Sequence, residues 1–82
     1  MKELLKKLTE AEMAANKADR EYNIEPENVE KEAAFDRAYN AEYKAYMEAA
    51  EELVKITGGK IEFDIAKRMI QTKRAEIEAL FT

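Results

Sequence analysis

The sequence contains no cysteine, no histidine and no tryptophan, and these absences exclude several kinds of structure and chemistry. Without cysteine the chain forms no disulfide, and without cysteine and histidine it has no ligands for the common zinc and iron sites. Histidine is the usual residue of general acid–base catalysis, and a cysteine nucleophile is also missing. We therefore predict that the protein is not an enzyme and that it binds no metal or cofactor.

Long apolar runs are absent as well. No stretch approaches the ~18 residues of a transmembrane helix, and residues 1–13 carry charges throughout, unlike a signal peptide. The composition is 39% charged and 46% hydrophobic, which is too hydrophobic for a disordered chain. These features predict a folded cytoplasmic protein without a membrane segment.

Helix-breaking residues are few. Pro26, Gly58 and Gly59 are the only proline and glycine residues, and they divide the 82 residues into three segments rich in strong helix formers. No segment shows the apolar–polar alternation of a β-strand. We predict one all-α domain over residues 1–82, with the second helix ending at Gly58 or Gly59 in a left-handed cap. The helices are expected over about 2–22, 26–57 and 62–80.

The apolar spacing predicts how these helices pack. A seam with spacings of 4, 3, 4, 3 and 4 follows the first helix at Leu4, Leu8, Ala11, Ala15, Ala18 and Tyr22. The middle helix carries two adjoining apolar arcs, together wider than one buried face. The alanine arc consists of Ala34, Ala38, Ala41, Ala45 and Ala49, and the aromatic arc of Phe35, Tyr39, Tyr43, Tyr46, Ala50, Leu53 and Val54. We assign the alanine arc to the first helix and the aromatic arc to the third. The predicted fold is a three-helix antiparallel bundle with a long central helix, completed by homodimerisation because three helices leave part of the aromatic arc uncovered.

Three of the four tyrosines, Tyr39, Tyr43 and Tyr46, fall on the aromatic arc, and Glu42 lies among them. A buried carboxylate is costly unless it is paired or hydrogen-bonded. In one interpretation, a tyrosine hydroxyl or a basic side chain of the third helix satisfies Glu42, or Glu42 lies at the margin of the buried face and extends its carboxylate into solvent. In the other, Glu42 and the three tyrosines form a polar patch that binds a partner.

The charge distribution suggests what kind of partner this would be. Residues 1–52 carry 8 Lys/Arg against 14 Asp/Glu, whereas residues 53–82 carry 6 against 4. Carboxylates are densest around the predicted first turn, where Glu25, Glu27 and Glu30 could face a basic protein surface. Our leading hypothesis is a small non-enzymatic adaptor or inhibitor that acts through helical surfaces, of a size and acidity that would suit a phage or mobile element.

Two further hypotheses remain open. A small dimeric nucleic-acid-binding regulator would use the basic third helix, through Lys67, Lys73 and Arg74. This alternative is less favoured, because nucleic-acid-binding domains normally carry a dense basic stripe and a positive net charge. The chain could also be a structural subunit of a larger assembly that binds no ligand.

Overall fold

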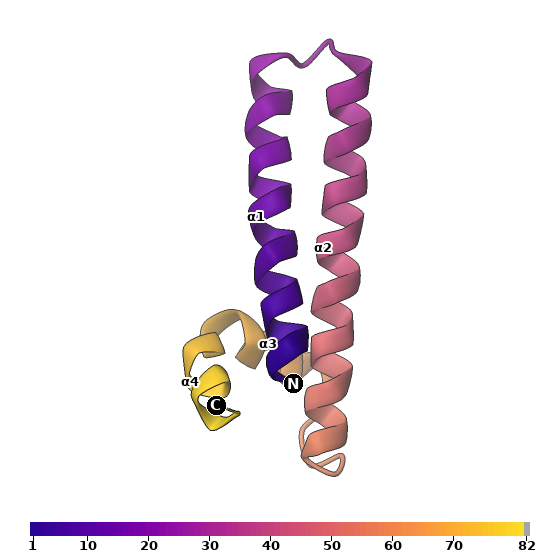
Figure 1. Ribbon diagram of the computed structural model, residues 1–82. Coiled ribbons are helices and arrows are strands. Elements are labelled where there is room, and N and C mark those ends of the chain that lie inside the picture. The colour runs from indigo at the N-terminus through magenta and orange to yellow at the C-terminus, as the bar shows by residue number, and fades with distance from the viewer. Residues whose placement is uncertain (82) are drawn as a thin grey trace.

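The computed structural model describes residues 1–81, and the regular secondary structure within this range is all helical. These are α1 (Lys2–Ile24), α2 (Val29–Ile56), α3 (Phe63–Thr72) and α4 (Arg74–Leu80). Helices α1 and α2 form a long antiparallel hairpin, α3 crosses behind its lower part and α4 lies beside the N-terminal end of α1 (Figure 1). The molecule is elongated, with extents of 46 × 22 × 18 Å. The prediction of an all-α fold is confirmed.

The turn between α1 and α2 is fixed by Asn28. Its side-chain oxygen accepts hydrogen bonds from the backbone N–H groups of Glu30 (3.0 Å) and Lys31 (3.2 Å). Asparagine is among the best N-cap residues because it satisfies donors that have no partner within the helix. For this reason α2 begins at Val29, later than the predicted start near residue 26, and Pro26 lies in the turn.

The C-terminal end of α2 is closed by the two glycines. Gly58 and Gly59 both have positive φ angles, 67° and 80°. The N–H of Gly59 donates to Val54 O and that of Gly58 to Lys55 O, both at 3.0 Å, which is the Schellman arrangement. The left-handed cap expected from the sequence is therefore present.

The expected third helix over residues 62–80 is not a single helix, so the three-helix count is not confirmed. It breaks at Lys73, whose backbone (φ −129°, ψ 31°) both ends α3 and begins α4. The sequence has neither glycine nor proline there. The break turns the chain back, so that Ile77 is only 3% exposed and joins the core cluster that contains Leu5 and Ile70. Tertiary packing therefore sets this boundary.

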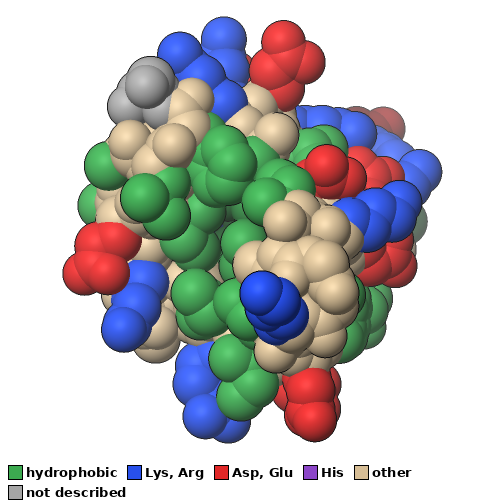
Figure 2. All heavy atoms as spheres, turned by 90° about the horizontal axis from the view of Figure 1, so that it is seen from below, with side chains coloured by type: hydrophobic (Ala, Val, Ile, Leu, Met, Phe, Trp, Pro, Cys, Tyr) green, Lys and Arg blue, Asp and Glu red, His purple; other side chains and the backbone are tan. Residues whose placement is uncertain are grey.

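The core occupies only one end of the hairpin. Its buried residues are Leu5, Leu8, Ala45, Ala49, Ala50, Leu53, Ala66, Ile70 and Ile77. Seen from this end, hydrophobic side chains lie near the middle of the surface, with charged side chains mostly around them (Figure 2). Between residues 16 and 44 no residue is buried. We call residues 16–44, which include the tip of the hairpin, the open half. The part of the molecule that α3 and α4 cover is called the closed half.

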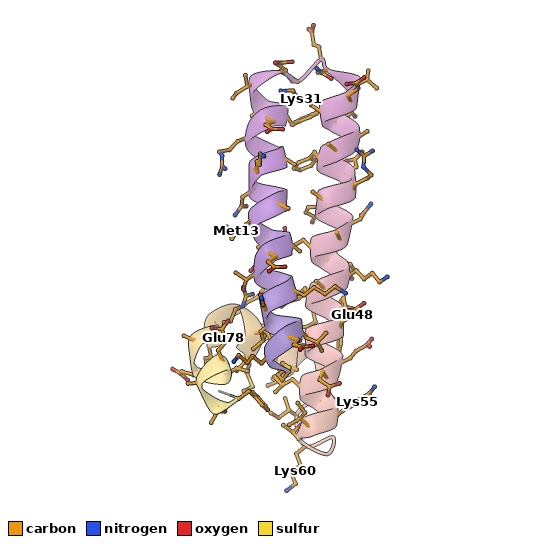
Figure 3. All side chains as sticks on the ribbon, in the orientation of Figure 1. Met13, Lys31, Glu48, Lys55, Lys60 and Glu78 are labelled. Carbon is orange, nitrogen blue, oxygen red and sulfur yellow. The ribbon has the colours of Figure 1, made fainter. Side chains whose placement is uncertain are left out.

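The predicted packing is correct in the closed half and incomplete elsewhere. The alanine arc is buried at Ala45 and Ala49, but Ala41 is exposed. Leu5 is fully buried although it lies beside the predicted seam of α1. Met13 is 67% exposed and projects from the side of α1 away from α2 (Figure 3). None of the helices in residues 1–81 is long and apolar enough to cross a membrane.

Candidate functional site

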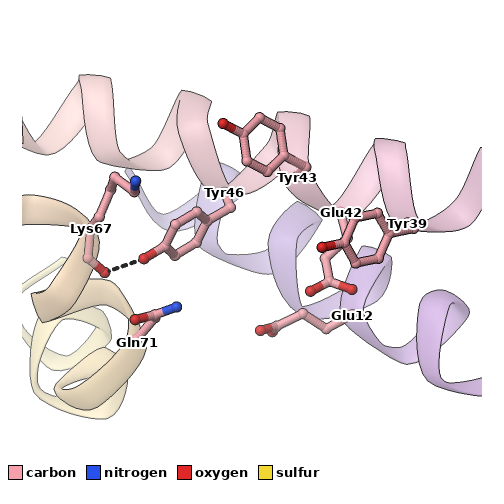
Figure 4. Close-up of a pocket in the computed structure, with 7 residues that line it drawn as sticks. All are labelled: Glu12, Tyr39, Glu42, Tyr43, Tyr46, Lys67 and Gln71. Atoms are coloured by element: carbon pink, nitrogen blue, oxygen red, sulfur yellow. Dashed lines mark hydrogen bonds between the residues drawn. The ribbon is translucent and has the colours of Figure 1, made fainter. Parts of the chain in front are cut away.

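A pocket of about 320 Å³ lies where α3 covers the hairpin beside the start of the open half. Helices α1, α2 and α3 all contribute to it (Figure 4). Its lining residues are Glu12, Tyr39, Glu42, Tyr43, Tyr46, Lys67 and Gln71. The pocket therefore brings together Glu42 and the three tyrosines that the sequence singles out.

Tyr46 joins α2 to α3 at the base of the pocket. Its hydroxyl donates a hydrogen bond of 2.6 Å to the backbone carbonyl oxygen of Lys67 (Figure 4). Burial raises the pKa of the Tyr46 hydroxyl, an effect that the nearby Arg74 guanidinium opposes. The ammonium of Lys67 lies 5.7 Å from the centroid of the Phe63 ring. Tyr46 thus has a structural partner and is only half-buried.

Glu42 has no such partner. Its carboxylate is half-buried and makes no hydrogen bond or ion pair with any residue in the described range. Partial burial raises the pKa of Glu42, the negative charge of Glu12 raises it further, and Arg74 opposes both effects. The Tyr46 hydroxyl is directed to α3 and does not satisfy Glu42, and the half-buried Glu42 side chain agrees with a position at the margin of the buried face.

Glu12 is a pocket residue that the sequence analysis missed. Its carboxylate forms an ion pair and a hydrogen bond with the guanidinium of Arg74, which ties α1 to the start of α4. A signal was available, since Leu5, Leu8 and Glu12 are spaced by 3 and 4 residues and share one side of α1. Gln71, from α3, could not be placed because its position depends on the path of that helix.

Beyond the pocket, the hairpin of α1 and α2 has no covering helix in the open half (Figure 1). The Tyr22 and Phe35 rings stack between the two helices at 5.5 Å between centroids, and Phe35 stacks on Tyr39 at 6.2 Å. Tyr39 and Tyr43 remain 57% and 56% exposed. Aromatic rings are therefore exposed on this surface of the hairpin.

Two rows of residues at helical spacing run along this surface of the hairpin, from the pocket into the open half. On α1 the row is Glu12, Asn16, Asp19 and Asn23, and on α2 it is Glu32, Phe35, Tyr39, Glu42 and Tyr46. Neither row contains lysine or arginine. We call these two rows, together with Tyr22 and Tyr43, the open face. Its carboxylates are Glu12 and Asp19 on α1 and Glu32 and Glu42 on α2, where they alternate with the aromatic residues.

The remaining residues of the predicted partner-binding set lie at the hairpin tip. Glu25 accepts a hydrogen bond from Asn28 Nδ2 (3.0 Å) and pairs with Lys31 (3.5 Å), and these two contacts lower the pKa of Glu25. Glu27 and Glu30 are exposed. Because α2 rises by about 1.5 Å per residue, the tip lies well away from Glu42. The predicted set therefore divides between two places.

The basic residues of the nucleic-acid alternative do not form one exposed stripe. Arg74 is bound to Glu12 and also donates to Ile70 O at 3.2 Å. Lys67 lines the pocket with its ammonium over the Phe63 ring, and Lys73 is exposed at the junction of α3 and α4. Two of the three cations therefore already have partners within the chain.

Comparison of the chain with protein-family models, with curated proteins and with solved structures finds no match. In the part of the chain that the structure describes, no three acidic side chains are grouped closely enough to hold a metal ion. The function must therefore be inferred from the open face and its pocket.

Proposed function

We propose that this protein is a non-enzymatic interaction module that binds a basic helical segment of a partner protein along the open face. The observation that carries this proposal is the uncovered surface of the hairpin beside the pocket, on which Tyr39 and Tyr43 are more than half exposed. Tyrosine is common at protein interfaces because it combines a large apolar ring with a polar hydroxyl. An adaptor or an inhibitor of a basic protein would act in this way.

The architecture supports a helix as the bound element. In the closed half, α3 and α4 supply the core residues Ala66, Ile70 and Ile77, whereas the open half has no such cover. A groove between two helices accepts the apolar side of a third, as in many complexes of proteins with helical peptides. A partner helix in the open half would extend the packing that α3 begins.

The charges of the open face favour a basic partner over a second copy. In a two-fold symmetric dimer the same surface is used by both subunits. Two copies meeting through the open face would bring Asp19, Glu32 and Glu42 of each copy near the carboxylates of the other, which is unfavourable. Homodimerisation stays a prediction, to be tested by light scattering, and it would require another surface, such as the side that exposes Met13.

The proposal can be tested with a 20-residue amphipathic helical peptide as the probe. This peptide has leucines along one side, lysines along the other and one arginine. Titration into the isotopically labelled protein should shift the amide resonances of Tyr22, Phe35 and Tyr39, with affinity that falls as salt is added. The matched control is the same peptide with glutamate at every basic position. Equal binding of the two peptides, shifts confined to the closed half, or no shifts would overturn the proposal.

A further inference from the structure

We infer that the pocket is an arginine-binding site, in which Glu42 pairs with the guanidinium of an arginine from the basic partner while Tyr39 and Tyr43 flank it. This inference rests on the proposed function and names the chemistry of its central contact. It assigns a task to a carboxylate that makes no hydrogen bond or ion pair within residues 1–81.

The distribution of charge leaves Glu42 available. Arg74 is bound to Glu12, and the ammonium of Lys67 lies over the Phe63 ring. Glu42 and Glu12 approach one another across the pocket (Figure 4), and their repulsion contributes to the raised pKa of Glu42. A cation placed beside Glu42 would offset this repulsion and would donate hydrogen bonds to the Glu42 carboxylate.

The shape and lining of the pocket favour arginine. A guanidinium is planar, donates in a fork that matches a carboxylate, and stacks on aromatic rings. Tyr39 and Tyr43 present such rings, and about 320 Å³ leaves space for a long side chain. The chain already uses this pairing at the edge of the pocket, where Arg74 binds Glu12. A divalent cation would need more oxygen ligands than two carboxylates provide.

The test uses the same peptide probe with the arginine moved through four successive basic positions. In the best of these peptides, replacement of arginine by citrulline keeps the shape but removes the charge. We expect the wild-type protein to bind the citrulline peptide about tenfold more weakly. In the Glu42→Gln variant the arginine and citrulline peptides should bind equally. The matched control is Glu51→Gln, an exposed carboxylate of α2 in the closed half, which should keep the tenfold difference.

The outcomes separate the two proposals. If every peptide binds the open face but citrulline costs nothing, the arginine site is wrong while the interaction module stands. If Glu42→Gln discriminates between the two peptides as well as the wild type does, Glu42 is not the partner and the inference is also wrong. If no peptide binds the wild-type protein, both proposals fail. A peptide with lysine at the same position should bind more weakly than the arginine peptide, and equal binding would contradict the assignment of arginine.

Discussion

At the scale of single residues, Glu42 is a carboxylate whose surroundings disfavour its negative charge. Water is partly excluded from its carboxylate, and Glu12 from α1 adds repulsion. Arg74 from α4 offsets part of this, while Lys67 from α3 is placed over a ring of its own helix. Residues that serve binding often lower the stability of the free protein, so the cost of Glu42 is consistent with the proposed site.

The pKa shift of Glu42 predicts the effect of removing its charge. A carboxyl whose pKa is raised in the folded state favours folding below its unfolded pKa, and this contribution is lost as pH rises through the folded pKa. We therefore expect Glu42→Gln to have a higher Tm than the wild type at pH 7. The advantage should disappear well below the ordinary value of 4.5, where Glu42 is protonated in both states. A lower Tm at pH 7 would show that Glu42 has a stabilising partner. The exposed Glu51→Gln is the control.

At the scale of secondary-structure elements, local rules account for some boundaries and not for others. The caps at Asn28 and at Gly58–Gly59 follow from residue types that prefer these conformations. The break at Lys73 has no such local signal, since Lys, Arg and Gln are good helix formers. It arises because Ile77 reaches the core only if α4 turns back, and no single-sequence pattern contains that information.

The cap of α2 gives a prediction at this scale. Asn28→Ala removes the acceptor for the N–H groups of Glu30 and Lys31, so the free energy of unfolding should fall by about 1 kcal/mol. It also removes the Nδ2 donor to Glu25, so the pKa of Glu25 should rise toward its ordinary value. Urea unfolding and an NMR pH titration measure the two effects. An unchanged pKa of Glu25 would mean that the hydrogen bond from Asn28 is not the main cause of the shift.

The packing of α4 against the core gives a second prediction at the scale of elements. Ile77→Ala should reduce the free energy of unfolding by about 2–5 kcal/mol, because it removes a side chain that is only 3% exposed from the core. Leu80 lies in the same helix and is 79% exposed, so Leu80→Ala should change the free energy of unfolding by less than about 0.5 kcal/mol. Equal effects at the two positions, measured by thermal unfolding, would show that α4 does not pack through Ile77.

At the scale of the whole molecule, the fold is a hairpin stabilised mainly at one end. Helix periodicity was sufficient to predict that Tyr39, Glu42, Tyr43 and Tyr46 lie close together, because all four are on one helix. It was not sufficient to add Glu12 and Gln71, since their positions depend on the alignment of α1 with α2 and on the crossing of α3. The single third helix was assigned to the aromatic arc with part of that arc left uncovered, and in the structure α3 ends at Thr72 and is hydrogen-bonded to the arc through Tyr46.

This asymmetry predicts uneven protection of backbone amides. Hydrogen exchange should be faster in the open half, over residues 16–24 and 31–41, than in residues 45–53, because no residue of the open half is buried. Both regions are helical, so the difference reports packing and not secondary structure. Equal protection in the two regions would mean that the open half is covered in the free protein, for example by a second copy.

The most direct measurement of the central claim compares two neighbouring substitutions in α2. Tyr39 belongs to the open face, whereas Asn40 is exposed on another side of the same helix. With the basic helical peptide as the probe, Tyr39→Ala should weaken binding about tenfold or more, as expected for an aromatic interface residue, and Asn40→Ala should leave the affinity unchanged. If the two variants bind the peptide equally well, the open face is not the interaction surface of this protein.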